Sequence, residues 1–205
     1  MTENADFAGQ IVRSMRRSIA TKELLLGNLE PVATIARVSE VLIGAFRAGN
    51  KVLLFGKGGS AADAQHIAAE FVGRFAFDRP ALPALALSVN TSCLTAIGND
   101  YGFDLVFARQ IEALGNRGDV AIGISTSGNS PNVIEGLSAG RRKGLHTVAL
   151  TGEGGGKLEG AVDDLICAPS NDTPRIQECH TLIGHVIAQL VEQDIFRAAR
   201  ALSQS

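Results

Sequence analysis

The spacing of hydrophobic positions divides the chain near Gly49. From Phe7 to Ala48 the apolar residues recur every three or four positions, which predicts helices. Pro31, preceded by Gly27 and Asn28, interrupts this spacing. Because proline is well tolerated at the start of a helix, the segment predicts a helical hairpin whose second helix begins near Pro31.

Beyond Gly49 short aliphatic and β-branched runs alternate with longer segments of helical spacing, which is typical of parallel strands joined by crossover helices. Helices are expected from Ser60, near Thr91, near Phe103, from Ser130, and from about Thr173 to Arg200. The expected strands span residues 51–55, 84–88, 119–124, 146–150 and 164–167. We therefore predict an α/β fold, a flavodoxin-like, doubly wound sandwich around a five-stranded parallel sheet.

Composition indicates one ordinary globular domain of 205 residues, 45% hydrophobic and 20% charged. A formal net charge of -2 without blocks of one sign argues against a nucleic-acid partner. The three cysteines are widely separated, which suggests reduced thiols and a cytoplasmic location. Residues 1–17 lack the apolar segment of a signal peptide, and no run approaches the roughly 20 apolar residues of a membrane helix.

Ligands of such folds bind at the carboxyl ends of the strands, so three loops are candidates for function. The loop Gly56-Lys57-Gly58-Gly59-Ser60 follows a strand and opens a helix, where backbone amides could surround an anion. An equally acceptable interpretation is that the glycines only permit a tight turn. The other two loops are Ser125–Ser130 and Thr151–Gly156.

Gly56, Gly58 and Ala61 also match the permissive fingerprint of dinucleotide-binding folds. That fingerprint expects an acidic residue at the end of the next strand, where this chain has Leu87-Ser88-Val89-Asn90. A Walker loop is excluded because the residue after Lys57 is glycine instead of Ser or Thr. We therefore expect no nucleotide cofactor.

The loop Ser125–Ser130 carries four hydroxyls directly after a buried strand. Hydroxyls and helix-terminal amides can satisfy the oxygens of a phosphate monoester, and Ser130 is also a plausible N-cap of the next helix. The alternative is a serine-rich capping turn. Four hydroxyls exceed what capping needs, so the loop favours a phosphate site.

His66 and Glu70 lie four residues apart and share one helix face. Gln177 and His185 lie eight apart on the last predicted helix, where they could both reach one point beside it. A carboxylate and an imidazole suffice to move a proton between adjacent carbons, which makes Glu70 and His185 a candidate pair. Spacing alone leaves open whether they meet, and His185 could instead be a packing residue beside an apolar stripe.

Together these motifs resemble the phosphoheptose isomerases, a family built on the sugar-isomerase (SIS) domain. The resemblance extends from about Gly49 to Phe196 and rests on the ordered set of segments 56–60, 63–66 with Glu70, 97–100, 125–130, and 175–178 with His185. It implies conversion of sedoheptulose 7-phosphate to D-glycero-D-manno-heptose 7-phosphate through an enediol. That is the first step toward the nucleotide-activated heptose of lipopolysaccharide or capsule.

The resemblance also implies roles for particular residues. Glu70 and His185 would be catalytic, and Ser125, Thr126, Ser127 and Ser130 would hold the phosphate. The sugar would be lined by Lys57, Gly58, Gly59, Ser60, Glu70, Asn99, Asp100 and Gln177, and zinc would be bound by His66, Glu70, Gln177 and His185. Residues 1–205 would form one SIS domain of a homotetramer with intersubunit active sites, in which the hairpin of residues 1–48 packs between subunits.

Two positions depart from the family pattern. Lys57 stands where asparagine is usual, and it either strengthens anion binding or lies in solvent. Pro174 stands where some relatives have a sugar-contacting aspartate, and Asp172 could replace it. The main alternative function is a non-catalytic SIS-domain protein, such as a replication-initiator-associating protein or a sugar-phosphate-sensing regulator. Retention of both Glu70 and His185 counts against it.

Overall fold

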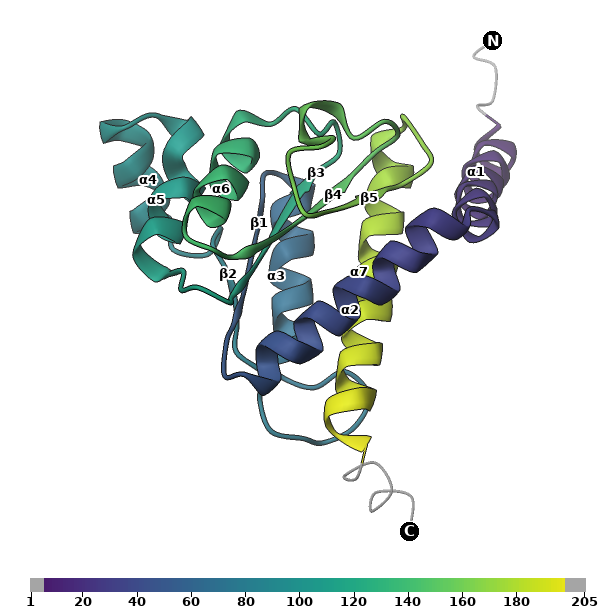
Figure 1. Ribbon diagram of the computed structural model, residues 1–205. Helices are drawn as coiled ribbons and strands as arrows, with labels where there is room; N and C mark the ends of the chain where they lie inside the picture. Colours follow the sequence, from purple (N-terminus) through teal and green to yellow (C-terminus); the bar gives the residue numbers. More distant parts are fainter. Residues whose placement is uncertain (1–5, 198–205) are drawn as a thin grey trace.

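The computed structural model describes residues 6–197 and contains a parallel sheet of five strands (Figure 1). The strand order is β2-β1-β3-β4-β5, and each neighbouring pair runs parallel. The order reverses beside β1, as in doubly wound folds, so the predicted architecture is confirmed. The strands are β1 (Val52–Gly56), β2 (Ala84–Ala86), β3 (Val120–Ser125), β4 (His146–Thr151) and β5 (Asp164–Cys167).

The helices follow the predicted order, with small differences at their ends. A short 3₁₀ turn precedes the helix expected near Phe103, and the last helix ends at Ile195, while Arg200 lies outside the described residues. The helices are α1 (Phe7–Gly27), α2 (Leu29–Arg47), α3 (Gly59–Val72), α4 (Thr91–Asp100), α5 (Val106–Leu114), α6 (Pro131–Arg142) and α7 (Thr173–Ile195). Two 3₁₀ helices, η1 (Phe103–Leu105) and η2 (Gly156–Leu158), complete the set.

Two hydrophobic cores cover the two faces of the sheet. Along β1, Val52 and Leu54 face the core formed by α2, α3 and α7. Leu53 and Phe55 face the opposite core, formed by α4, α5 and α6. Side chains alternate between faces along a strand, and both faces are covered, so all five residues of β1 are buried. Figure 1 shows the two helical layers on either side of the sheet.

The N-terminal helical pair forms as expected, with Asn28 as the only residue between α1 and α2. Its backbone N–H donates to the Leu25 carbonyl at 3.4 Å, and its side-chain oxygen accepts from the Glu30 N–H at 3.1 Å. One residue thus ends the first helix and caps the second. In Figure 1, α1 stands away from the sheet at the edge of the molecule.

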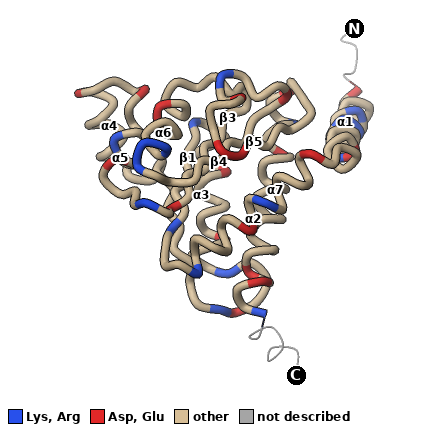
Figure 2. The backbone as a smooth tube through the Cα atoms, in the orientation of Figure 1, with Lys and Arg blue, Asp and Glu red and all other residues tan. Residues whose placement is uncertain are grey.

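Charged residues of both signs are distributed over both layers, in keeping with the small net charge (Figure 2). No helix among residues 6–197 combines the length and hydropathy needed to cross a membrane.

Candidate active site

The fold creates a crevice where the strand order reverses. β1 and β3 are neighbours, yet α3 leaves β1 toward one face while α6 leaves β3 toward the other. The loop Gly56–Ser60 and the loop Ser125–Ser130 therefore flank the gap between the carboxyl ends of these strands. Each loop also opens a helix, so backbone N–H groups point toward the same edge.

Two glycines of the loop Gly56–Ser60 are required, each for a different reason. Gly58 adopts φ 58° at the start of α3, a conformation that side chains disfavour. A methyl group at Gly59 would overlap the side-chain amide of Gln177 on α7. The glycine loop thus packs directly against Gln177, which the sequence analysis assigns to the same site. Ser60 is buried, whereas Lys57 is exposed.

The hydroxyls of the serine loop fall into two groups. Ser125 and Ser130 are buried, and the Ser125 hydroxyl donates to Ser130 Oγ at 3.0 Å. Ser130 occupies the N-cap position of α6, but its side chain makes no capping hydrogen bond. Thr126 is half-buried and Ser127 is exposed, so these two hydroxyls are the accessible ones.

A cavity of about 440 Å³ opens between the serine loop, the loop after β4 and the start of α7. It is lined in part by Thr126, Ser127 and Asn129. Asn129 joins two of the loops, because its side chain donates to the Ser127 carbonyl at 2.8 Å and accepts from the Lys157 N–H at 3.0 Å. The cavity is therefore a polar recess with fixed walls at the carboxyl edge of the sheet.

A larger cavity of about 530 Å³ lies beside the edge strand β2. Its lining is mainly apolar, with Leu85, Val89 and Ile97, and it includes none of the predicted site residues. The cavity of about 440 Å³ is the better candidate for a phosphate site, because polar groups from several loops converge there.

The helices α3 and α7 bring three chemically capable side chains together. The Nε2 atoms of His66 and His185 lie 2.6 Å apart, and His66 Nε2 lies 3.5 Å from Glu70 Oε1. The potential ligand atoms of all three lie within 4.8 Å of one another. His66 is exposed, whereas Glu70 and His185 are half-buried, so the cluster is open to a ligand on one side. Glu70 and His185 therefore meet within one chain.

His180, by contrast, is a packing residue. It is fully buried, and its Nε2 lies 3.0 Å from the carbonyl oxygen of Thr151, which requires the proton on Nε2. Nδ1 has no hydrogen-bond partner within residues 6–197. Burial lowers the pKa of His180 from 6.5 to about 4, although the bond to Thr151 opposes this shift. The imidazole is therefore neutral near pH 7.

Asn99 and Asp100 lie at the exposed C-terminal end of α4, where the Asn99 amide donates to the Asp100 carboxylate at 2.8 Å. α4 packs on the core opposite to α7. Within the described part of this single chain, no hydrogen bond links this pair to the cluster on α3 and α7.

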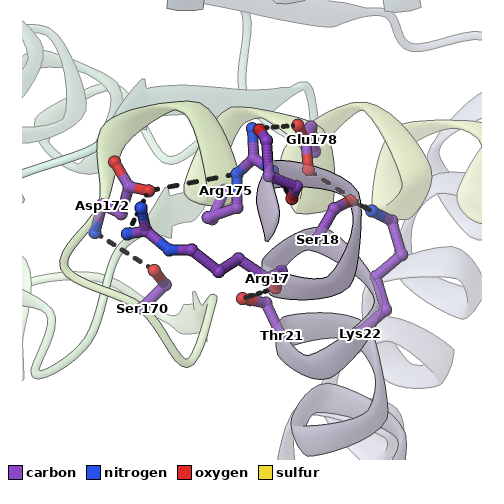
Figure 3. A network of polar contacts seen from close by, with 9 residues as sticks. Arg17, Ser18, Thr21, Lys22, Ser170, Asp172, Arg175 and Glu178 are labelled. Carbon is purple, nitrogen blue, oxygen red and sulfur yellow. Dashed lines mark hydrogen bonds and ion pairs between the residues drawn. The ribbon is translucent and has the colours of Figure 1, made fainter. Parts of the chain in front are cut away.

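Asp172 lies at the N-cap of α7, but helix α1 engages its carboxylate. Arg17 donates to Asp172 Oδ2 at 2.8 Å, and Arg175 Nε lies 4.0 Å from the same oxygen (Figure 3). Arg175 also donates to the Ser14 carbonyl on α1 at 2.7 Å. The polar side of α1 thus anchors the segment that leads into α7.

Glu178 extends this network by one turn of α7 (Figure 3). Burial alone would raise its pKa, but a hydrogen bond with Ser18 and the charges of Arg175 and Lys22 hold the pKa of Glu178 below its usual range. Its carboxylate lies 2.7 Å from Arg175 and 3.5 Å from Lys22. It therefore stays ionised and keeps α1 attached to α7.

Comparison with known proteins identifies the family. The SIS-domain model matches residues 22–152. The chain is 55% identical over 183 residues to the phosphoheptose isomerase of Aneurinibacillus thermoaerophilus, covering 89% of this chain and 92% of that protein. It is 50% identical over 186 residues to that of Sulfurimonas denitrificans, covering 91% and 95%. The chain belongs to the phosphoheptose isomerase family of SIS-domain proteins.

Solved structures of the phosphoheptose isomerase family share its fold. The structure of the Neisseria gonorrhoeae phosphoheptose isomerase superposes with a TM-score of 0.85 at 42% identity, covering 91% of this chain and 98% of that one. That of Francisella tularensis gives 0.86 at 34% identity with the same coverage. The expected resemblance is thus confirmed, and a non-catalytic SIS-domain protein is not favoured.

Sequence reasoning missed the polar residues that hold the site of this family member in place. Arg79 and Glu192 form a buried pair behind Glu70, and Asp63 joins Thr181 at 3.0 Å one turn before the cluster. In each of these two pairs, the partners are more than 110 residues apart in the sequence. No local spacing signals such pairs.

The buried His180 predicts a specific pH dependence of stability. Between pH 6.5 and about 4 the unfolded state binds a proton that the folded state does not, so acidification favours unfolding. We expect the free energy of unfolding to fall between pH 7 and pH 5 by about 2 kcal/mol more in the wild type than in His180→Gln, which does not titrate. Urea unfolding at both pH values measures this difference, and equal losses in the two proteins would contradict it.

Proposed function

We propose that this chain is an aldose–ketose isomerase that converts sedoheptulose 7-phosphate to D-glycero-D-manno-heptose 7-phosphate. The observation that carries the proposal is the convergence of Glu70 and His185, from helices α3 and α7, at one point between the two helices. The names of the relatives support this substrate. The pair supplies what the reaction needs, a base and a group that moves protons between oxygens.

The reaction relocates hydrogen without net oxidation. One of Glu70 and His185 removes a proton from C1 of the ketose, beside the C2 carbonyl, and the C1–C2 bond becomes the double bond of an enediol. The other group moves the proton between the two oxygens. Return of a proton to C2 leaves the aldehyde at C1. The developing charge on oxygen requires a positive or hydrogen-bonding group near the pair, which His66 or a metal ion held by it can provide.

The phosphate would bind at the serine loop. Thr126 and Ser127 offer accessible hydroxyls at the cavity wall, and the N-terminus of α6 follows directly. Ser125 and Ser130 would support the loop through their mutual hydrogen bond. We propose the sugar contacts for the residues named from the family pattern, Lys57, Gly58, Gly59, Ser60, Asn99, Asp100, Asp172 and Gln177.

Zinc is a suitable metal for the cluster on α3 and α7. Two imidazole nitrogens and a carboxylate oxygen within 4.8 Å match the donor types of zinc sites. We propose His66, Glu70 and His185 as ligands, with Gln177 as the fourth predicted ligand. Bound zinc would polarise the substrate carbonyl, and it would also restrain Glu70 as a free base, which would leave the proton transfer from carbon to His185 or to Glu70 released from the metal. Metal analysis of protein purified without chelator should give about one zinc per chain; active protein without zinc would contradict this assignment.

We further propose that the chain, as one SIS domain, assembles into a homotetramer through the helical segment 1–48. Helices of this segment expose a series of large apolar residues, namely Phe7, Ile11, Val12, Met15, Ile19, Leu24, Leu26, Leu29 and Val32. The position of Asn99 and Asp100 on the opposite layer from α7 suits a contribution to a neighbouring subunit's site. Light scattering should give four times the mass of the 21.4 kDa chain, and a monomer would reject the assembly.

We place the reaction in the cytoplasm, upstream of lipopolysaccharide or capsule synthesis. The separated cysteines of the sequence support a reducing compartment.

Replacing either member of the catalytic pair should abolish most turnover. We expect Glu70→Gln and His185→Gln to lower kcat by about 10²- to 10⁴-fold, because each removes one proton-transfer group. A coupled assay with sedoheptulose 7-phosphate measures the loss. His146→Gln is the matched control, since His146 bonds Asp164 where β4 and β5 begin and makes no hydrogen bond to the three cluster residues. Near-normal turnover by either variant would reject the pair.

The serine loop should affect binding more than chemistry. Ser127→Ala removes one exposed hydroxyl from the cavity, and we expect KM to rise about 10- to 100-fold with kcat little changed. Ser138→Ala, an exposed serine on α6, should leave both constants unchanged. A variant with unchanged KM would show that this hydroxyl does not hold the phosphate.

A further inference from the structure

A fully buried ion pair lies behind the cluster on α3 and α7. The side chains of Arg79 and Glu192 are each 1% exposed, and Arg79 Nε donates to Glu192 Oε1 at 3.1 Å. Desolvating two charges is costly, so such a pair is weak evidence for a gain in stability. Its other contacts indicate what it holds.

Besides the carbonyl of the neighbouring Pro80, the guanidinium of Arg79 binds the backbone at the end of α3. Arg79 donates to the carbonyl oxygens of Glu70 at 2.8 Å and Phe71 at 2.7 Å, which lie in the last turn of the helix. Carbonyls in that turn lack helical partners, and a cation there is favourable. The guanidinium therefore fixes the backbone that carries the proposed catalytic carboxylate.

Glu192 holds the segment that follows α3. Its Oε1 accepts from the Phe75 N–H and its Oε2 from the Ala76 N–H, both at 2.8 Å. The Phe75 ring lies 5.7 Å from the His185 ring, and Glu192 lies seven residues after His185, on nearly the same face of α7. The carboxylate thereby keeps Phe75 beside the imidazole.

The other end of the two helices is fixed independently. Thr181 donates to Asp63 at 3.0 Å, and burial raises the pKa of that carboxyl although the Thr181 bond and nearby His66 oppose it. Between the two ends, Gly184 of α7 lets the two helices pack closely, because a methyl group at this position would lie 2.5 Å from Ile67 Cδ1 of α3. The helices can therefore still pack when the Arg79–Glu192 pair is altered.

We propose that Arg79 and Glu192 are positioning residues for the isomerase reaction, which set the place of Glu70 and Phe75 relative to His185. The proposal rests on the function assigned above to Glu70 and His185. It makes the pair responsible for the rate of proton transfer and leaves phosphate binding to the serine loop, which it does not touch.

The test is a kinetic comparison of wild type, Glu192→Gln and Arg79→Lys with sedoheptulose 7-phosphate. The glutamine loses one of the two backbone acceptors, and the lysine keeps the charge but loses the fork that reaches Glu70 and Phe71. We expect kcat to fall about 10- to 100-fold in each variant, with KM within about twofold. Circular dichroism establishes that each variant is folded.

A third variant and a control complete the design. Phe75→Leu, at a half-buried position, leaves the ion pair intact and should also lower kcat at constant KM. Arg47→Met breaks another ion pair of α7, which joins Arg47 on α2 to Asp194 at 2.7 Å, and should change neither constant. If Glu192→Gln and Arg79→Lys do not fold, unchanged kcat in Phe75→Leu overturns the proposal, because the place of Phe75 would then not matter to the reaction.

The failure of the proposed function and the failure of the positioning role give different results. An inactive wild type removes the proposed function and the positioning role with it. An active wild type whose folded variants keep kcat within about twofold, or whose KM rises in step with the loss of kcat, overturns the positioning role alone.

Discussion

The close packing of α3 against α7 is the constraint on which the site depends. The two helices meet where Gly184 faces Ile67, a contact that leaves no room for a side chain at residue 184. The close packing of the two helices allows His66 on α3 to reach His185 on α7, although the two residues are 119 positions apart in the sequence. A larger separation would leave each polar group isolated at the protein surface, with no shared point at which a ligand could bind.

The sheet contributes the other half of the site in a different way. Its reversal of strand order places the glycine loop and the serine loop side by side, and Gln177 joins the first of these to α7. In the proposed reaction, anion binding would depend on backbone groups and short hydroxyls, whereas proton transfer would depend on side chains of two helices. This division explains why substitutions in the serine loop and at the helix pair should separate KM from kcat.

The sequence predicts features whose causes are local. Buried strands appear as short apolar runs, so their limits are found within two residues, and the helical spacing of His66 and Glu70 places both on one face. Long-range geometry is not encoded in such patterns. The mutual hydrogen bond of Ser125 and Ser130, which replaces the expected capping bond, depends on how the loop closes. The capture of Asp172 by Arg17 joins residues 155 positions apart.

Helix α7 shows how a site can be held by a regular element instead of by loops. Proposed site residues, Gln177 and His185, are separated and followed along it by anchoring residues, namely His180, Thr181, Gly184 and Glu192. His180 fixes it to the end of β4 through Thr151, and Glu192 fixes it to the segment after α3. Groups placed on a helix that is anchored on both sides of the reacting position have little freedom to move, which favours accurate proton transfer. The buried polar groups that cost stability in isolation are therefore located where the proposed chemistry needs rigidity.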